Sequence, residues 1–168
     1  MSLLFGGLGL TLGACDSDPD AFPEPEACDA FDYAGFDPGP TLNFHEEVRP
    51  LFGRCAGSTC HGSPRSSAAG LYLAMPAGDT PEDATERARI VAESLIVPAR
   101  TTPDLPRITP GRPDQSLLMH KLDGSHDCLG LTCPGGDCGL RMPRGGTPLS
   151  AEERDVIRRW IAQGARAN

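Results

Sequence analysis

The stretch Cys55-Ala56-Gly57-Ser58-Thr59-Cys60-His61 places two thiols and an imidazole close together in the chain. Covalent attachment of a haem requires these three groups: each thiol adds to a vinyl group to form a thioether, and the adjacent imidazole binds the iron as the proximal ligand. The usual spacing is Cys-x-x-Cys-His, whereas four residues separate the cysteines here. Because a wider loop still presents both sulfurs, we expect one covalent haem c on Cys55 and Cys60, with His61 on the iron.

The same stretch has two other interpretations. A disulfide between Cys55 and Cys60 would close a small loop and leave His61 as an ordinary polar residue. A structural zinc site is disfavoured if the chain is exported, because a thiolate cluster is prone to oxidation outside the cytoplasm.

An iron that only carries electrons needs a second axial ligand, and a methionine thioether in that place raises the reduction potential. Met142 lies in Arg141-Met142-Pro143, inside a Gly/Pro-rich loop that cannot be helical and that precedes the last expected helix. We therefore expect Met142 to be the distal ligand. The same dipeptide recurs as Met75-Pro76, and the other residues that could ligate are His45, His120 and His126.

The N-terminal residues predict export. Residues 1–14 form a short, uncharged, leucine-rich stretch that is too short for a stable transmembrane helix and runs into Leu12-Gly13-Ala14-Cys15. This ending resembles the lipobox of a bacterial lipoprotein signal. The resemblance implies cleavage before Cys15, lipidation of that cysteine, and anchoring to the cell envelope at the periplasmic face or the outer membrane. The alternative is an apolar N-terminus with a free Cys15.

Segment 15–43 is acidic and proline-rich, and it precedes a domain that we place at residues 44–168. The acidic residues of this segment, which contains no basic residue, are Asp16, Asp18, Asp20, Glu24, Glu26, Asp29, Asp32 and Asp37. The chain has a formal charge of -8, so residues 44–168 are formally neutral. Because like charges repel and proline interrupts packing, we expect an extended, disordered tether. The charge argues against nucleic acid as a partner, and the lack of long apolar runs excludes a multipass membrane protein.

Four further cysteines are candidates for disulfides. They are Cys28 in the tether and Cys128, Cys133 and Cys138 in an irregular loop. Three cysteines in one loop cannot all pair with one another, so we expect one bridge from Cys28 to this loop and a second bridge within it. A metal cluster that includes His126 is the functional alternative, disfavoured by export.

Local signals predict four helices. Asn43 can cap a helix through Phe44 and Phe52, which Pro50 should kink or shorten. The others are a helix from Thr80 to about Ser94, a shorter one from Pro113 to Gly124, and a last one from Ser150 to Gly164 that starts with a capping box. We expect the first and last helices to cross, with Phe44 or Val48 touching Ile157, Trp160 or Ile161.

Residues 44–165 resemble the planctomycete-type cytochrome c domain. The matching stretches are Phe44-His45-Glu46-Glu47-Val48-Arg49-Pro50-Leu51-Phe52, Cys60-His61-Gly62, Gly70-Leu71-Tyr72-Leu73, Pro110-Gly111-Arg112-Pro113, Ser116-Leu117-Leu118, Arg141-Met142-Pro143, Leu149-Ser150-Ala151-Glu152-Glu153 and Trp160-Ile161-Ala162-Gln163-Gly164-Ala165. The resemblance implies a small, mostly helical cytochrome c fold with long Gly/Pro-rich loops, a haem on Cys55 and Cys60, and His61 and Met142 as axial ligands.

These features predict a membrane-anchored electron carrier rather than an enzyme, because two filled axial positions leave no open site on the iron. Its partner would be a redox protein that the sequence does not identify. The alternative is a haem-free lipoprotein module, held by disulfides, that binds or scaffolds other envelope components. A haem enzyme such as a peroxidase is a third reading and would need an open distal side. Hydrolase and phosphate-loop motifs are missing from the sequence.

Overall fold

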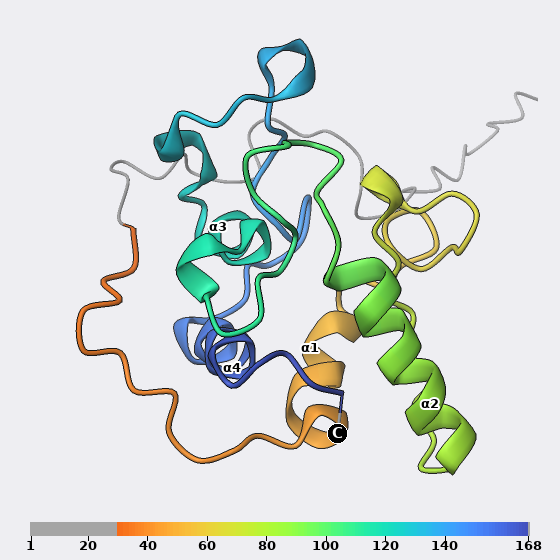
Figure 1. The fold of residues 1–168 in the computed structure, drawn as a ribbon. Coiled ribbons are helices and arrows are strands. Elements are labelled where there is room, and N and C mark those ends of the chain that lie inside the picture. The colour runs from red at the N-terminus through yellow and green to blue at the C-terminus, as the bar shows by residue number, and fades with distance from the viewer. Residues whose placement is uncertain (1–29, 168) are drawn as a thin grey trace, which may run out of the picture.

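Helices are the regular elements of the part of the chain that the structure describes. The structure is a computed structural model that describes residues 30–167 (Figure 1). This part of the chain holds four α-helices, several short 3-10 and π turns and no strand; Pro98 and Pro106 form an isolated antiparallel bridge. The prediction of a small, mostly helical domain with long loops is therefore confirmed.

The first helix combines a π-helical turn, Phe44–Val48, with α1, Arg49–Gly53. Asn43 caps it as predicted, because its side-chain oxygen accepts the backbone N–H of Glu46 at 3.1 Å. Pro50 lies at the start of α1, where a missing N–H costs least, and the wider π turn directly precedes it. This short helix ends just before the stretch that begins at Cys55.

The second helix begins and ends close to where the local signals predict; the third ends as predicted, but it begins at Leu117 rather than at Pro113, because Ser116 is extended. Helix α2, Pro81–Ile90, starts with a capping box between Thr80 and Asp83 and continues into the π turn Val91–Leu95. A 3-10 turn at Pro113–Gln115 leads into α3, Leu117–Asp123. Gly124 ends α3 in a left-handed conformation (φ 81°), which glycine adopts without strain.

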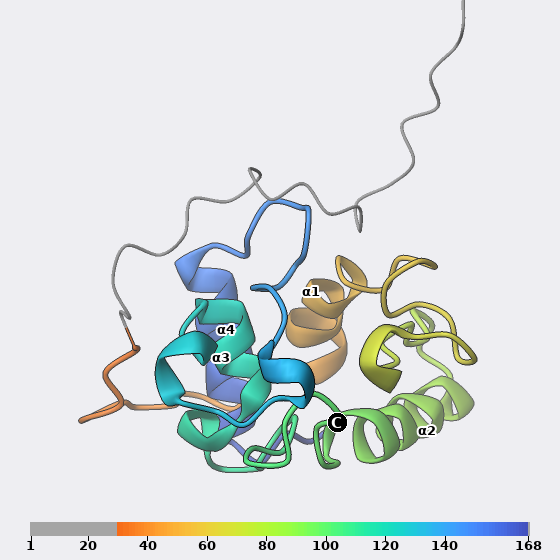
Figure 2. The same cartoon turned by 90° about the horizontal axis from the view of Figure 1, so that it is seen from above.

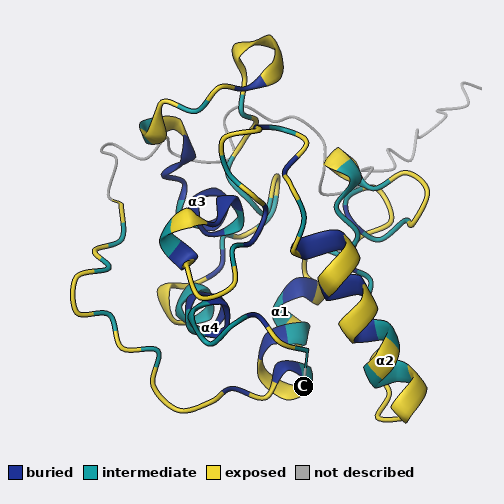
Figure 3. Ribbon diagram, in the orientation of Figure 1, coloured by how far each residue is buried: buried dark blue, intermediate teal, exposed yellow. Residues whose placement is uncertain are grey.

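Helix α4, Ala151–Ala162, packs against the first helix and against α3 (Figure 2). Ser150 and Glu153 form the predicted capping box. The ring of Phe44 lies 5.2 Å from that of Trp160, and the ring of Phe52 lies 5.7 Å from it. These contacts confirm that the first and last helices meet, and they lie in the core, where both helices bury their apolar faces (Figure 3).

Residues 30–43 run around the outside of α4 without regular structure (Figure 1). They differ from a free tether, because they dock on α4. The Arg158 guanidinium carbon lies 3.6 Å from the Phe31 ring centroid, Leu42 is buried, and the Leu42 N–H donates to Gln163 at 3.0 Å. Aromatic residues between the acidic ones therefore give this segment a surface that α4 can hold.

Three predictions fall on residues that the structure does not describe. The signal peptide at residues 1–14, the lipidation of Cys15 and the pairing of Cys28 lie outside the described residues. Between residues 30 and 167, no helix has the length and apolar character needed to cross a bilayer.

Candidate functional site

The stretch from Cys55 to His61 forms a loop that returns on itself directly after α1. The N–H of His61 donates to the carbonyl of Cys55 at 3.3 Å, and the N–H of Gly62 donates to that of Gly57 at 2.9 Å. A Cβ on Gly62 would lie 2.1 Å from the carbonyl oxygen of Ala56, so this turn has room only for glycine. The loop thus brings Cys55 and His61 together through its own main chain.

His61 is buried and oriented by the backbone that follows it. Its ring Nδ1 lies 3.0 Å from the carbonyl oxygen of Leu71, and its own carbonyl accepts the N–H of Leu73 at 2.8 Å. A ring that donates from Nδ1 to a carbonyl keeps the lone pair on Nε2, which is how metal-binding histidines are commonly held. Burial lowers the pKa of His61, which favours the neutral imidazole that an iron needs.

The two cysteines of the stretch differ in state. Cys55 is a free thiol that packs against the hydrophobic core, and burial raises its pKa, so the sulfur stays protonated. Cys60 takes part in a disulfide. A thioether at Cys60 requires a thiol, so attachment at this position and the disulfide exclude each other.

Both candidate methionines are partly buried against the core, but they lie in different surroundings. The N–H of Met142 donates to the carbonyl of Lys121 at 2.9 Å. Met75 lines a cleft of about 410 Å³ that adjoins the Cys55–His61 stretch at Ala56. The other lining residues include Arg49, Tyr72, Leu73 and Glu86. Neither His61 nor Met142 is among them, so the residue that the structure brings to this cleft is Met75.

The remaining histidines are engaged by their neighbours. Both ring nitrogens of His120 have partners, the hydroxyl of Ser125 at 3.0 Å and the carbonyl of Asp114 at 3.1 Å. Nε2 of His126 lies 2.6 Å from the carbonyl oxygen of Gly139. His45 pairs with Asp79, 2.7 Å from a carboxylate oxygen. In residues 30–167 no group of three or more His, Cys, Asp or Glu side chains is arranged to hold a metal ion.

The irregular loop before Met142 carries the predicted internal disulfide, between Cys133 and Cys138. Cys128 also takes part in a disulfide. The buried ammonium of Lys121 donates to the carbonyls of Cys138, Gly139 and Leu140, at 2.6 Å for Gly139 and 3.2 Å for Leu140. Burial lowers the pKa of Lys121 to about 8.

Sequence reasoning did not assign Lys121 a role. The available signal was that it is the single lysine of a chain with 15 basic residues. Its side chain and its own carbonyl together fix residues 138–142, the approach to Met142.

Comparisons with protein-family models, with curated proteins and with solved structures found no match to this chain. Whether the stretch suits a haem therefore depends on the side-chain groups that it offers to the iron and to the porphyrin. The His61 imidazole, the Cys55 thiol and a methionine thioether are groups that a c-type haem uses. The Cys60 sulfur suits that role only after its disulfide is reduced.

Proposed function

We propose that this chain is a membrane-anchored mono-haem c-type cytochrome that transfers electrons. The observation that carries the proposal is the position of His61: its ring is buried, Nδ1 is occupied by the carbonyl of Leu71, and the stretch that contains it places Cys55 beside it. A bound haem c would supply a one-electron couple on its iron.

In this proposal each residue has a defined role. Cys55 and Cys60 carry the thioether bonds, His61 binds the iron through Nε2, and Met142 is the distal ligand. The protein fixes the His61 ring through Leu71 and keeps water from it by burial. With both axial positions filled, the chain is not an enzyme.

The proposed location follows from the sequence. Lipidation of Cys15 would anchor the domain to the bacterial cell envelope after export, at the periplasmic face or the outer membrane. Disulfides are stable in such a compartment, which agrees with the bond between Cys133 and Cys138. The electrons would pass to a redox protein that docks on the domain.

The second candidate is the haem-free envelope module. The disulfide states favour it: Cys133 and Cys138 are bonded to each other, and Cys60 and Cys128 are also disulfide-bonded. If Cys60 remains in its disulfide, haem attachment at both sulfurs is excluded, and the chain is then a stapled binding or scaffolding module.

Expression of the full chain in a host that matures c-type cytochromes separates the two candidates. We expect a protein heavier by one haem, whose colour survives acid-acetone extraction because thioether bonds hold the porphyrin. The variants Cys55→Ala and Cys60→Ala should each lose one thioether, and the double variant should release its haem on extraction. A colourless wild-type protein of unchanged mass would contradict the cytochrome and favour the stapled module.

The two Met-Pro dipeptides provide a matched test of the distal ligand. We expect Met142→Ala to abolish the thioether–iron charge-transfer absorption of the oxidised protein and to lower the reduction potential by on the order of 0.1 V. Met75→Ala should leave both unchanged. The reverse pattern would assign the distal position to Met75, which lines the cleft beside Ala56.

A further inference from the structure

The turn Ala69–Leu71 holds more than the His61 ring. While the carbonyl of Leu71 faces Nδ1 of His61 at 3.0 Å, the carbonyl of Ala69 accepts a hydrogen bond from Nη2 of Arg107 at 2.6 Å. Between them, Gly70 lies against the guanidinium of Arg100. One short turn therefore links the candidate iron ligand to two arginines.

Arg107 is buried without a negative partner in the described chain. Only 8% of the residue is exposed, and its hydrogen bonds go to two neutral carbonyls, those of Ala69 and of Ser94 at 2.7 Å. Burial lowers the pKa of Arg107, and the nearby charge of Arg100 lowers it further. Burying a cation without a charged partner costs free energy, and an anion that binds beside it offsets part of that cost.

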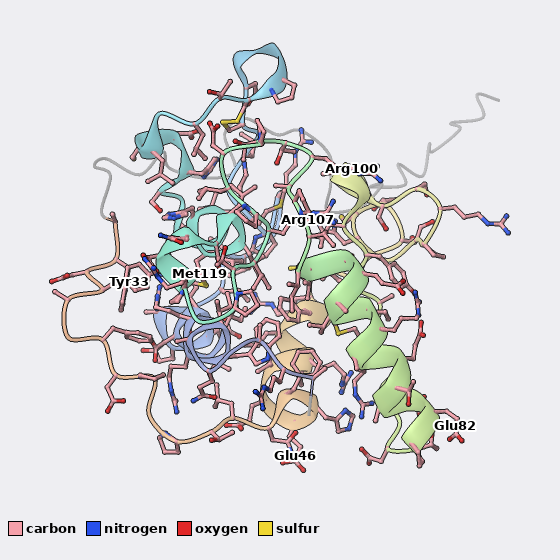
Figure 4. All side chains as sticks on the ribbon, viewed as in Figure 1. Tyr33, Glu46, Glu82, Arg100, Arg107 and Met119 are labelled. Carbon is pink, nitrogen blue, oxygen red and sulfur yellow. A yellow bond between two sulfur atoms is a disulfide. The ribbon has the colours of Figure 1, made fainter. Side chains whose placement is uncertain are left out.

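Arg100 is exposed and lies over the same turn (Figure 4). A Cβ on Gly70 would lie 2.6 Å from the central carbon of its guanidinium, so the absence of a side chain at Gly70 makes this approach possible. Gly70 also has φ +67°, which disfavours any other residue. The backbone at Gly70 thus leaves room for the Arg100 guanidinium on the same turn that accepts a hydrogen bond from Arg107.

Five other arginines of the domain form ion pairs with carboxylates, whereas Arg87, which is as buried as Arg107, also donates to two carbonyls. Those with such ion pairs are Arg54, Arg89, Arg112, Arg154 and Arg158. Within residues 30–167, Arg100 and Arg107 form no ion pair of this kind, although they are close enough to repel each other. Arg100 and Arg107 therefore place two positive charges beside one turn, with no ion-pair partner in the described chain.

We propose that Arg100 and Arg107 form a binding site for a carboxylate group. Guanidinium N–H donors form a planar fork that matches the two oxygens of a carboxylate. The carboxylate has two sources with the same chemistry: a propionate side chain of the haem, or an anion in solution. The first source rests on the proposed function, because the turn that holds His61 also holds the site; the site itself does not.

Titration of the haem-free protein with inorganic phosphate and with propanoate, at constant ionic strength, tests the site. We expect the amide signals of Gly70 and Leu71 to shift in NMR spectra and Arg100→Gln to weaken binding about tenfold, the loss of one charge-assisted hydrogen bond. Arg100→Lys should bind with intermediate affinity, because it keeps the charge and loses the fork. Arg65→Gln, at an exposed arginine of the preceding loop, should bind like wild type. Equal affinity in Arg100→Gln and wild type would overturn the site.

The haem-loaded protein identifies the source. If a propionate occupies the site, added phosphate no longer shifts the Gly70 signal in the loaded wild type but still does so in the haem-free form. A shift that persists after loading overturns the propionate as source and supports a soluble anion. If the wild type takes up no haem, the proposed function fails, whereas the titration of the haem-free chain still decides the site.

Discussion

The loop 55–75 and the loop 128–142 lie on different sides of the domain, beside α2 and beside α3 (Figure 1). The first is held by its own main chain, as in the bonds from His61 N–H to the Cys55 carbonyl and from Leu73 N–H to the His61 carbonyl. The second is held by the Lys121 ammonium and the Cys133–Cys138 disulfide. The first should therefore respond little to loss of the Cys133–Cys138 bond or of the Lys121 charge, while the second should respond to both.

The largest effect should come from filling the turn in the first loop. We expect Gly62→Ala to destabilise the fold by about 3 kcal/mol, since its Cβ would collide with the carbonyl oxygen of Ala56 at 2.1 Å. In the control Gly57→Ala, the Cβ lies 3.9 Å from the nearest atom, the Cys60 sulfur, and we expect a change below about 0.5 kcal/mol. Urea unfolding measures both; equal stabilities would refute the main-chain account of this loop.

The next effect should come from removing the internal disulfide of the second loop. We expect the double variant Cys133→Ala/Cys138→Ala to lose about 2 kcal/mol, the chain-entropy value for so short a loop. The variant is preferable to a reductant, because Cys60 and Cys128 are also disulfide-bonded. Amide exchange should accelerate at residues 138–142 and stay unchanged at residues 61–73. Acceleration in both loops would show that they are not independent.

The smallest effect should be the pH response of Lys121. Burial lowers its pKa to about 8 from the ordinary lysine value of 10.5, so between these values the unfolded chain binds more protons than the folded one. Stability contributed by this group therefore rises with pH, by about 1 kcal/mol between pH 8 and pH 9. We expect Lys121→Met to lack this rise when urea unfolding is followed at both pH values. An identical pH profile in the variant would contradict the assignment.

The helices could be predicted because their signals are local. The capping boxes at Thr80 and Ser150 depend on residues three positions apart, and Gly124 ends α3 through its own backbone freedom. The contact of Phe44 with Trp160 is long-range, yet each residue lies on an apolar helix face, so its prediction required only that two faces meet.

The polar contacts that hold the candidate site could not be predicted. Lys121 reaches carbonyls 17 to 19 positions away, and Arg107 reaches Ala69 across 38 positions. A carbonyl is present at every residue, so no pattern of side chains marks which one accepts. The docking of Phe31 on Arg158 was also missed. The acidic residues and prolines of segment 15–43 predicted a tether, and that prediction gave no weight to the aromatic residues among them.

The docking of residues 30–43 on α4 limits how far the domain can stand above a bilayer. If Cys15 carries the proposed lipids, the connecting chain begins there and ends where Phe31 contacts Arg158. At full extension those residues span on the order of 50 Å. If the proposed cytochrome is anchored in this way, it would exchange electrons within that distance of the lipid headgroups.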